Sequence, residues 1–323
     1  MATTLLLLVA SLLALSAGAE LLVGGAASLA RRLRIAPFFI GLTIVGFGTS
    51  TPELFTSLLA TWRGQVDISV GNVMGSNVFN IALILGLTAV IAPIPVSPAR
   101  VRSEVWAVIG FATVPFAALA SGGVVGRELG GLMLLGLAAY VWRGAARGRR
   151  DGEEAASPGS DAESWARLRT PVACLAAVLV GLVLLVVGSA LLVDSATTLA
   201  RALGVSDLLI ALTIVAGGTS APELVTSLVA ALRRQPEIAL GNILGSNVFN
   251  VAGILGLAAL LRPQTLAPQV LGLDAPVMLA FSLALLPLLR GPRVGRRAGG
   301  LLLVGYGAYL AALLAWAPGR FGG

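Results

Sequence analysis

Hydrophobic residues fill ten long stretches of the chain, and polar residues collect in the gaps between them. The stretches run over about 3–30, 36–62, 68–91, 103–120 and 125–142, and then over about 171–200, 206–232, 238–261, 269–289 and 298–317. Crossing the hydrocarbon of a bilayer takes a helix of about 20 predominantly apolar residues. The pattern therefore predicts an all-α integral membrane protein with about ten transmembrane helices.

The two halves of the chain are copies of one unit. Residues 18–87 align without gaps on residues 188–257, with about 40 of 70 positions identical and a constant offset of 170. Such self-similarity indicates an internal repeat. Because five spans per half is an odd number, the second copy enters the membrane from the opposite side, and the repeats are predicted to be inverted, as in many transporters. The predicted organisation is a five-helix repeat (1–142), a linker (143–170) and a second five-helix repeat (171–323).

The linker is the only long polar stretch, and its Gly, Ser, Ala and charged residues favour a flexible connection over a domain. The rest of the composition agrees with a membrane protein. Hydrophobic residues make up 57% of the chain and charged residues only 11%, against roughly 25% charged in soluble domains. The net charge of +7 comes from arginines in the gaps between apolar runs. This placement favours the positive-inside rule over nucleic-acid binding, and no nucleic acid is expected as a partner.

The arginines also predict the orientation. If the linker is cytoplasmic, about 17 of the 22 arginines lie inside, which places both termini outside the cytoplasm. The expected location is the cell inner (plasma) membrane, with multiple passes. The apolar N-terminus could be a secretory signal, but no basic residues precede it, and part of it recurs in the second half, so a retained helix is favoured.

The second helix of each repeat carries an unusual motif, GLTIVGFGTSTPEL at 41–54 and ALTIVAGGTSAPEL at 211–224. Pro52 and Pro222 have no amide hydrogen, so the carbonyls near Gly48 and Gly218 are predicted to lose their helical partner and face a ligand. Irregular backbone at membrane depth persists only inside the protein or along a water-filled cavity. These helices are therefore predicted to be broken, near the centre of the bundle.

Glu53 and Glu223 end these motifs inside apolar helices. A carboxylate near the bilayer centre costs at least about 2.5 to 3.5 kcal/mol, which a structural role seldom justifies. No arginine lies near them in these helices, so a bound cation or a proton must compensate their charge. The alternative is a pair of permanently protonated glutamates within the core.

The third helix of each repeat carries GNVMGSNVFN at 71–80 and GNILGSNVFN at 241–250, and it too is predicted to be broken. Ser76 and Asn80 are four residues apart and share a helix face, as do Ser246 and Asn250. These side chains are candidate ligands. The alternative is that small residues and Asn join membrane helices by packing and hydrogen bonds, and this alternative is strongest for the remaining amides, Asn72, Asn77, Asn242 and Asn247.

The pooled ligands are carboxylates, hydroxyls, amides and carbonyls, which are hard oxygen donors. The chain has no His, and Cys174 is its only cysteine, so neither imidazole nor a thiolate cluster is available. Mg²⁺ demands strict octahedral geometry and dehydrates reluctantly, so a shared flexible site fits Ca²⁺ and Na⁺ better. No cofactor is expected, and the expected partners are the lipid bilayer and the transported ions, with no obligatory protein partner evident.

At these residues the sequence resembles the sodium/calcium exchanger branch of the calcium/cation antiporter superfamily. GTSxPE and GSNxFN, each present twice, carry the resemblance. It implies a Na⁺/Ca²⁺ antiporter in which Glu53 and Glu223 share the ions by alternating access. It also implies a set of further ligands: Thr49 and Thr219 at the calcium site, Ser50, Ser220, Ser76 and Ser246 with the carbonyls of Gly46 and Ala216 at flanking sodium sites, and Asn80 and Asn250 between the acids.

Other readings stay open at this point. Asn250 stands where potassium-dependent relatives carry Asp, and the GNxxE motif of the proton-coupled branch is absent, so sodium coupling is favoured. Proton-coupled or potassium-dependent exchange remains the alternative. An intramembrane enzyme that uses the two glutamates as acid and base is a minor one. Glu20 and Asp194 also lie within apolar runs, where they could line an ion pathway or be satisfied by helix ends or water.

Overall fold

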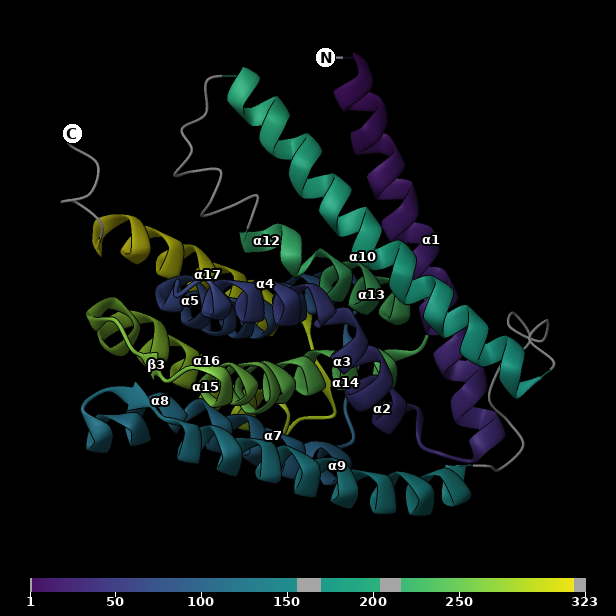
Figure 1. Cartoon of the computed structure of the whole chain (residues 1–323). Coiled ribbons are helices and arrows are strands. Elements are labelled where there is room, and N and C mark those ends of the chain that lie inside the picture. Colours follow the sequence, from purple (N-terminus) through teal and green to yellow (C-terminus); the bar gives the residue numbers. More distant parts are fainter. Residues whose placement is uncertain (1, 156–169, 204–215, 317–323) are drawn as a thin grey trace. The chain divides into compact units, whose positions relative to one another are not determined.

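The computed structural model describes residues 2–155, 170–203 and 216–316, and nearly all of them are helical (Figure 1). Within these residues, eight helices are long and apolar enough to cross a membrane, or nine if one bent pair counts as a span. The prediction of an all-α membrane protein is confirmed. Of the ten predicted spans, the one at 206–232 begins in a stretch outside the described residues.

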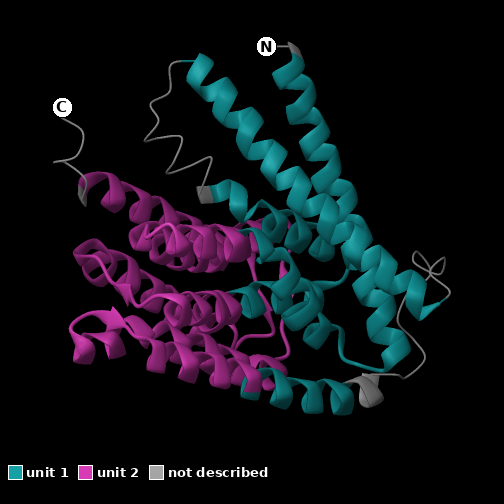
Figure 2. Cartoon of the chain, in the orientation of Figure 1, with its two compact units in different colours: residues 1–52, 139–246 teal, residues 53–138, 247–323 magenta. Residues whose placement is uncertain are grey.

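The chain divides into two compact units (Figure 2). Unit 1 comprises residues 1–52 and 139–246, and unit 2 comprises residues 53–138 and 247–323. Each unit therefore contains segments of both sequence repeats, because the division falls inside the two repeated motifs, after Pro52 and after Ser246. The helices α4, α9 and α14 cross these divisions.

Unit 1 contains the two longest helices, α1 (Ala2–Leu33) and α10 (Pro171–Ala202), which pack along each other. Leu15, Leu22 and Leu185 are buried in their shared core. Its shorter elements are α2 (Pro37–Ile40), η1 (Gly41–Val45), α3 (Gly46–Thr49), α12 (Ala216–Thr219), α13 (Ala221–Leu232) and most of α14 (Pro236–Val248).

Unit 2 is built from the remaining helices and four two-residue strands. Its elements from the first repeat are α4 (Thr51–Trp62), α5 (Val66–Val78), η2 (Phe79–Leu85), α6 (Gly86–Ile91), β1 (Ile94–Pro95), α7 (Pro98–Ala112), α8 (Val114–Ala117), η3 (Ala118–Ser121), β2 (Val124–Val125) and the first part of α9 (Arg127–Ala155). Those from the second are η6 (Phe249–Leu255), α15 (Gly256–Leu261), β3 (Gln264–Thr265), η7 (Val270–Asp274), α16 (Ala275–Leu288), β4 (Arg293–Val294) and α17 (Arg296–Trp316). The strands pair antiparallel, β1 with β4 and β2 with β3, and the sequence pattern did not predict them.

The predicted break in the second span is present. Helix α3 ends at Thr49, Ser50 has φ −78° and ψ 11°, and α4 starts again at Thr51 after a bend of 45°. Proline fits this restart because the first turn of a helix needs no amide donor from it. Ser220 adopts a similar conformation before α13, with Pro222 in that helix's first turn.

The third span of each repeat is not broken. It continues from Val66 to Ile91 and from Pro236 to Leu261, and each contains a seven-residue π-helical segment, η2 or η6. A π-helix keeps the backbone hydrogen-bonded while it rewinds the helix, so no chain end is exposed. The predicted breaks at these two helices are therefore replaced by π-helical segments.

The fifth span is longer than its apolar pattern. Helix α9 continues to Ala155, although its hydrophobic run ends near residue 142, and the predicted linker at 143–170 is helical over its first part. The backbone amide of Ala36 donates to the carbonyl of Gly148 in this extension, at 2.8 Å. Residues 156–169 of the predicted linker lie outside the described residues.

Candidate functional site

A close helix crossing in unit 1 assembles the first group of candidate ligands. A Cβ atom added to Gly245 on α14 would lie 1.9 Å from the carbonyl oxygen of Leu42, and one added to Gly241 would lie 2.4 Å from that of Phe38. Only glycine permits this approach of two backbones, as in other membrane helix pairs. The crossing brings α3 and α14 within hydrogen-bonding distance.

Six residues meet at this crossing, and we call them the Glu223 cluster: Gly46, Thr49, Ser50, Glu223, Asn242 and Ser246. The Ser50 hydroxyl donates to Glu223 Oε1 at 2.8 Å, and the Thr49 hydroxyl donates to Asn242 Oδ1 at 3.0 Å. The Ser246 hydroxyl donates to the Gly46 carbonyl at 3.0 Å. All six are buried. Five of the twelve predicted ligands thus lie together in unit 1, and Asn242 joins them.

One oxygen of this cluster has no partner. Glu223 Oε2 is buried and accepts no hydrogen bond from any described residue. Glu223 lies in the first turn of α13, where the positive end of the helix dipole favours a carboxylate. The cluster therefore combines a carboxylate oxygen, three hydroxyls and a carbonyl, which are ligands for a hard cation.

An asparagine supports each glutamate from the neighbouring helix. In unit 1, Asn242 Nδ2 donates to Ser227 Oγ at 2.9 Å and to the main-chain carbonyl of Glu223 at 3.3 Å. In unit 2, Asn72 makes the equivalent bonds to Ser57 at 2.9 Å and to the Glu53 carbonyl at 3.2 Å. These amides hold the helix that carries the acid, which favours the structural reading for both. The serines were missed from sequence, although both stand four residues after their glutamate.

Unit 2 holds a second group of candidates. Glu53 is fully buried in the first turn of α4, and Ser76 is buried on α5. Asn77 Nδ2 donates to the main-chain carbonyl of Asn247 at 3.2 Å and joins α5 to α14 within this unit. This bond favours a structural role for Asn77 over a role as an ion ligand.

Asn80 and Asn250 differ from the other amides. Each is buried in a π-helical segment, and neither its amide nitrogen nor its oxygen has a hydrogen-bond partner among the described residues. A buried polar group left without a partner costs about 1 to 3 kcal/mol. Four such atoms at equivalent repeat positions make these two amides the clearest candidate ligands in unit 2.

The remaining predicted ligands lie near the start of α13. Ala216 begins α12, Thr219 ends it, and Ser220 follows as a buried residue. All three belong to unit 1.

The prediction of free carbonyls at Gly48 and Gly218 is wrong. The Gly48 carbonyl accepts the Thr51 hydroxyl at 2.7 Å, and the Gly218 carbonyl accepts the Ser189 hydroxyl at 2.6 Å. Proline does remove a backbone donor, but a nearby hydroxyl replaces it. The sequence contained both hydroxyls, yet only the fold places Ser189 beside Gly218.

The acids outside the motifs fall into two groups. Glu20 forms an ion pair with Arg233, at 2.7 Å from the guanidinium, and Asp194 is exposed on α10. Two further acids were missed, Glu104 and Asp274, which are buried and separated by the repeat offset of 170. Asp274 accepts a hydrogen bond from the Tyr309 hydroxyl at 2.9 Å.

Membrane-length helices with buried carboxylate, hydroxyl and amide groups are typical of a membrane ion transporter. The comparisons with known proteins identify the family. A family model for the sodium/calcium exchanger protein matches residues 3–143 and 174–315, and the chain belongs to this family.

Several relatives are similar to this chain over nearly its whole length. The protein CaxA of Alkalimonas amylolytica is 39% identical over 305 residues, which cover 90% of this chain and 92% of that protein. The sodium/calcium exchanger MaX1 of Methanosarcina acetivorans is 31% identical, with 95% of this chain and 97% of that protein covered. The solved structure of the sodium-calcium exchanger NCX_Mj, soaked with Na⁺ and Ca²⁺, matches with a TM-score of 0.82 and 31% identity, over 96% of this chain and 98% of that one.

Proposed function

We propose that this protein is a Na⁺/Ca²⁺ antiporter. Membership of the sodium/calcium exchanger family supports this function. Among the contacts of the described residues, the Glu223 cluster carries the proposal, because a buried carboxylate with one unpartnered oxygen sits among hydroxyl and carbonyl oxygens. Such a group calls for a positive charge, and its donors suit a hard cation.

The proposed ligands are those that the resemblance implies. Glu53 and Glu223 would share the transported ions, with Thr49 and Thr219 completing the calcium site. The proposed flanking sodium sites would use Ser50, Ser220, Ser76 and Ser246 with the carbonyls of Gly46 and Ala216. Asn80 and Asn250 would take the polar position that the resemblance implies between the acids. The contact of Ser246 with the Gly46 carbonyl and of Ser50 with Glu223 supports this grouping for one of the flanking sites.

Exchange follows from the charge of such a set. Two carboxylates balance one Ca²⁺ or two Na⁺, so either ion set can neutralise the same ligands. A site whose charge is neutralised by bound ions can pass from facing one side of the membrane to facing the other at low cost. Two bare carboxylates in a low-dielectric interior instead repel each other and attract water. The proposed mechanism is alternating access in which the site changes the side that it faces only while ions are bound. Asn80 and Asn250 are neutral, which keeps the charge at two and disfavours a third cation such as K⁺.

The proposed membrane orientation places residues 143–170 in the cytoplasm and both termini outside it, in the inner (plasma) membrane. The support is the distribution of arginines, about 17 of 22 on the proposed cytoplasmic side. Cysteine accessibility tests this proposal, since a cysteine placed in the 156–169 stretch should react with impermeant reagents only in inside-out vesicles.

The deciding experiment is calcium uptake by proteoliposomes that contain the purified full chain and are loaded with Na⁺. Uptake should require the outward Na⁺ gradient and should not respond to K⁺. A pH gradient that drives uptake in the absence of Na⁺ would overturn sodium coupling in favour of protons. Empty liposomes and liposomes with equal Na⁺ on both sides provide the baseline.

A further inference from the structure

A cavity lies in unit 2 between the first turns of α7 and the last turns of α16. Strand β1 precedes α7 and β4 follows α16, and the pairing of Ile94 with Val294 joins these two ends. The Val96 amide also donates to the Pro292 carbonyl at 2.9 Å. Because the start of one helix is tied to the end of the other, α7 and α16 pack in opposite directions.

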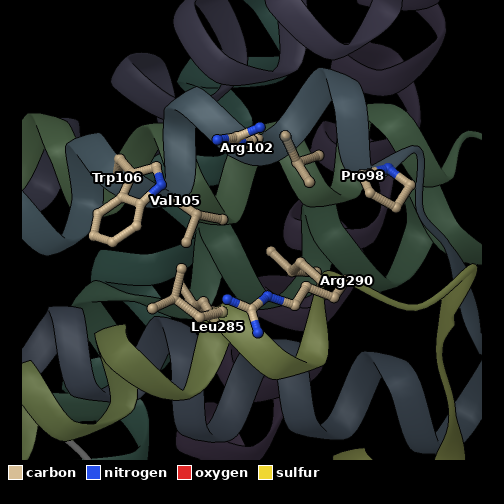
Figure 3. A pocket seen from close by; sticks show the side chains of 9 residues that line it. Pro98, Arg102, Val105, Trp106, Leu285 and Arg290 are labelled. Atoms are coloured by element: carbon tan, nitrogen blue, oxygen red, sulfur yellow. The ribbon is translucent and has the colours of Figure 1, made fainter.

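The cavity has a volume of about 300 Å³ and is apolar on its inner side. Val105 and Leu285 lie on its two walls, and Trp106 stands at its side with about half of its surface exposed (Figure 3). Tryptophan is typical of the level where helices leave the hydrocarbon. This size is at the lower end of small-molecule sites and is enough for a headgroup and the top of an acyl chain.

Two arginines line the same cavity, Arg102 from α7 and Arg290 from just beyond α16 (Figure 3). Both are exposed, and neither has a hydrogen bond or ion pair with another described residue. Two uncompensated positive charges beside an apolar cavity at a helix end complement a ligand with an anionic head and an apolar tail. Guanidinium groups bind phosphate oxygens in bidentate geometry.

We propose that this cavity is a binding site for an anionic phospholipid, with its phosphate held by Arg102 and Arg290 and its acyl chain along Val105 and Leu285. Basic pockets between transmembrane helices are known to suit anionic headgroups. The site is separate from the proposed ion ligands, none of which lines the cavity.

The repeat provides an internal contrast. The offset of 170 places Gly272 at the position of Arg102 and Pro276 at that of Trp106. The next elements, β2 and β4, are offset by 169, which places Ser121 at the position of Arg290. The equivalent positions of the other copy therefore have neither the arginines nor the tryptophan. The basic, aromatic composition belongs to one end of this helix pair only, as expected for recognition of lipid in one leaflet.

Native mass spectrometry of the purified full chain tests the proposal. Dioleoyl phosphatidylglycerol should bind to the wild type more tightly than dioleoyl phosphatidylcholine, and the double variant Arg102→Gln with Arg290→Gln should lose this preference by about tenfold or more. The matched control is Arg293→Gln with Arg297→Gln, which removes the same charge from the adjacent β4–α17 segment, outside the cavity lining, and should keep the preference.

A second variant separates the cavity from its charge. Val105→Trp fills the apolar wall and leaves both arginines, so tight binding of phosphatidylglycerol should be lost. The proposal is overturned if the double variant binds phosphatidylglycerol like the wild type, if the control pair loses the preference equally, or if millimolar glycerol phosphate displaces the lipid and shows that the headgroup alone is recognised. Unchanged calcium binding by the double variant keeps this test independent of the ion site.

Discussion

The Glu223 cluster in unit 1 and the Asn80 and Asn250 pair in unit 2 satisfy their polar groups in opposite ways. In the cluster, the hydroxyls of Thr49, Ser50 and Ser246 each donate to a neighbouring oxygen. In the pair, both amides are buried without a partner among the described residues. A hydroxyl can turn its hydrogen away and offer its oxygen to a cation, whereas an unpartnered amide remains at a cost until something binds it. In the first region one carboxylate oxygen of Glu223 is left for a ligand to satisfy, whereas in the second all four side-chain amide atoms are.

The largest expected effect comes from the carboxylates. Glu223→Gln and Glu53→Gln should each reduce sodium-driven calcium uptake by about a hundredfold or more, because a neutral amide replaces a charged ligand. The measurement is initial calcium uptake into proteoliposomes, with exposed Glu128→Gln as the control for loss of an acid. If either variant transported like the wild type, that glutamate would not be an ion ligand.

The next largest effect is expected from a substitution that disrupts the helix crossing in unit 1. Gly245→Ala places a Cβ atom 1.9 Å from the Leu42 carbonyl, so the two backbones must separate. Overpacking of this kind costs about 3 kcal/mol. Thermal unfolding, monitored by size-exclusion chromatography, should show a lower melting temperature for Gly245→Ala. The control Gly307→Ala on α17, where the added atom meets nothing within 4 Å, should keep the melting temperature of the wild type. Equal melting temperatures for both variants would contradict the crossing.

Two asparagines sharpen the comparison directly. Asn242→Leu removes bonds to Ser227, Thr49 and the Glu223 carbonyl and should destabilise the protein by about 2 kcal/mol. Asn250→Leu removes an unpartnered amide, so in ion-free buffer it should be neutral or stabilising, yet it should lower calcium uptake. Melting temperatures and uptake measured on the same preparations test this opposite pair. Destabilisation by Asn250→Leu in ion-free buffer would mean that its amide is already satisfied.

Single hydroxyls should matter less. Ser50→Ala and Ser246→Ala each remove one neutral ligand from the Glu223 cluster, and we expect the sodium concentration for half-maximal exchange to rise by about three- to tenfold. Ser189→Ala is the control, since its hydroxyl only caps the Gly218 carbonyl. If the calcium concentration for half-maximal exchange rose and that for sodium did not, both serines would be calcium ligands and not sodium ligands.

The smallest effect is expected at the ion pair of Glu20 and Arg233. Both side chains are partly exposed, at 32% and 51%, and such pairs contribute about 0 to 1 kcal/mol. Arg233→Gln should leave the melting temperature nearly unchanged. Glu20→Gln should have equally little effect on transport if the acid only pairs with Arg233, so a large loss of uptake would place Glu20 on an ion pathway instead.

Much of this architecture could be predicted from sequence because lipid imposes a simple rule on length and polarity. The apolar runs and the break before Pro52 follow from that rule and from proline's missing donor. The π-helical form of the third span could not be predicted, because this span is buried over most of its surface and its nearly continuous apolar run hides the change of face that a π-turn introduces. The end of α9 was missed because its last turns are polar, and hydrophobicity marks where a helix leaves the membrane and not where it stops.

The candidate residues were accessible for a similar reason. Glu53 and Glu223 are charges inside apolar helices and are visible in any hydropathy pattern. Ser57 and Ser227 were missed because serine in a membrane helix is ordinary, and its role depends on which amide lies opposite. Glu104 and Asp274 needed only the repeat offset, but the identity between the two copies falls off beyond residue 87 and obscures their correspondence.

The two π-helical segments, Phe79–Leu85 and Phe249–Leu255, stand at the same position of each repeat to the residue. Such a segment adds one residue to a helical turn, and two independent insertions at one position are far less simple than one inherited insertion. The ancestral half-length protein would then already have carried the widened turn before its gene was duplicated. A single ancestral amide, copied when the half-length unit was duplicated, is the simplest origin of Asn80 and Asn250 inside these turns.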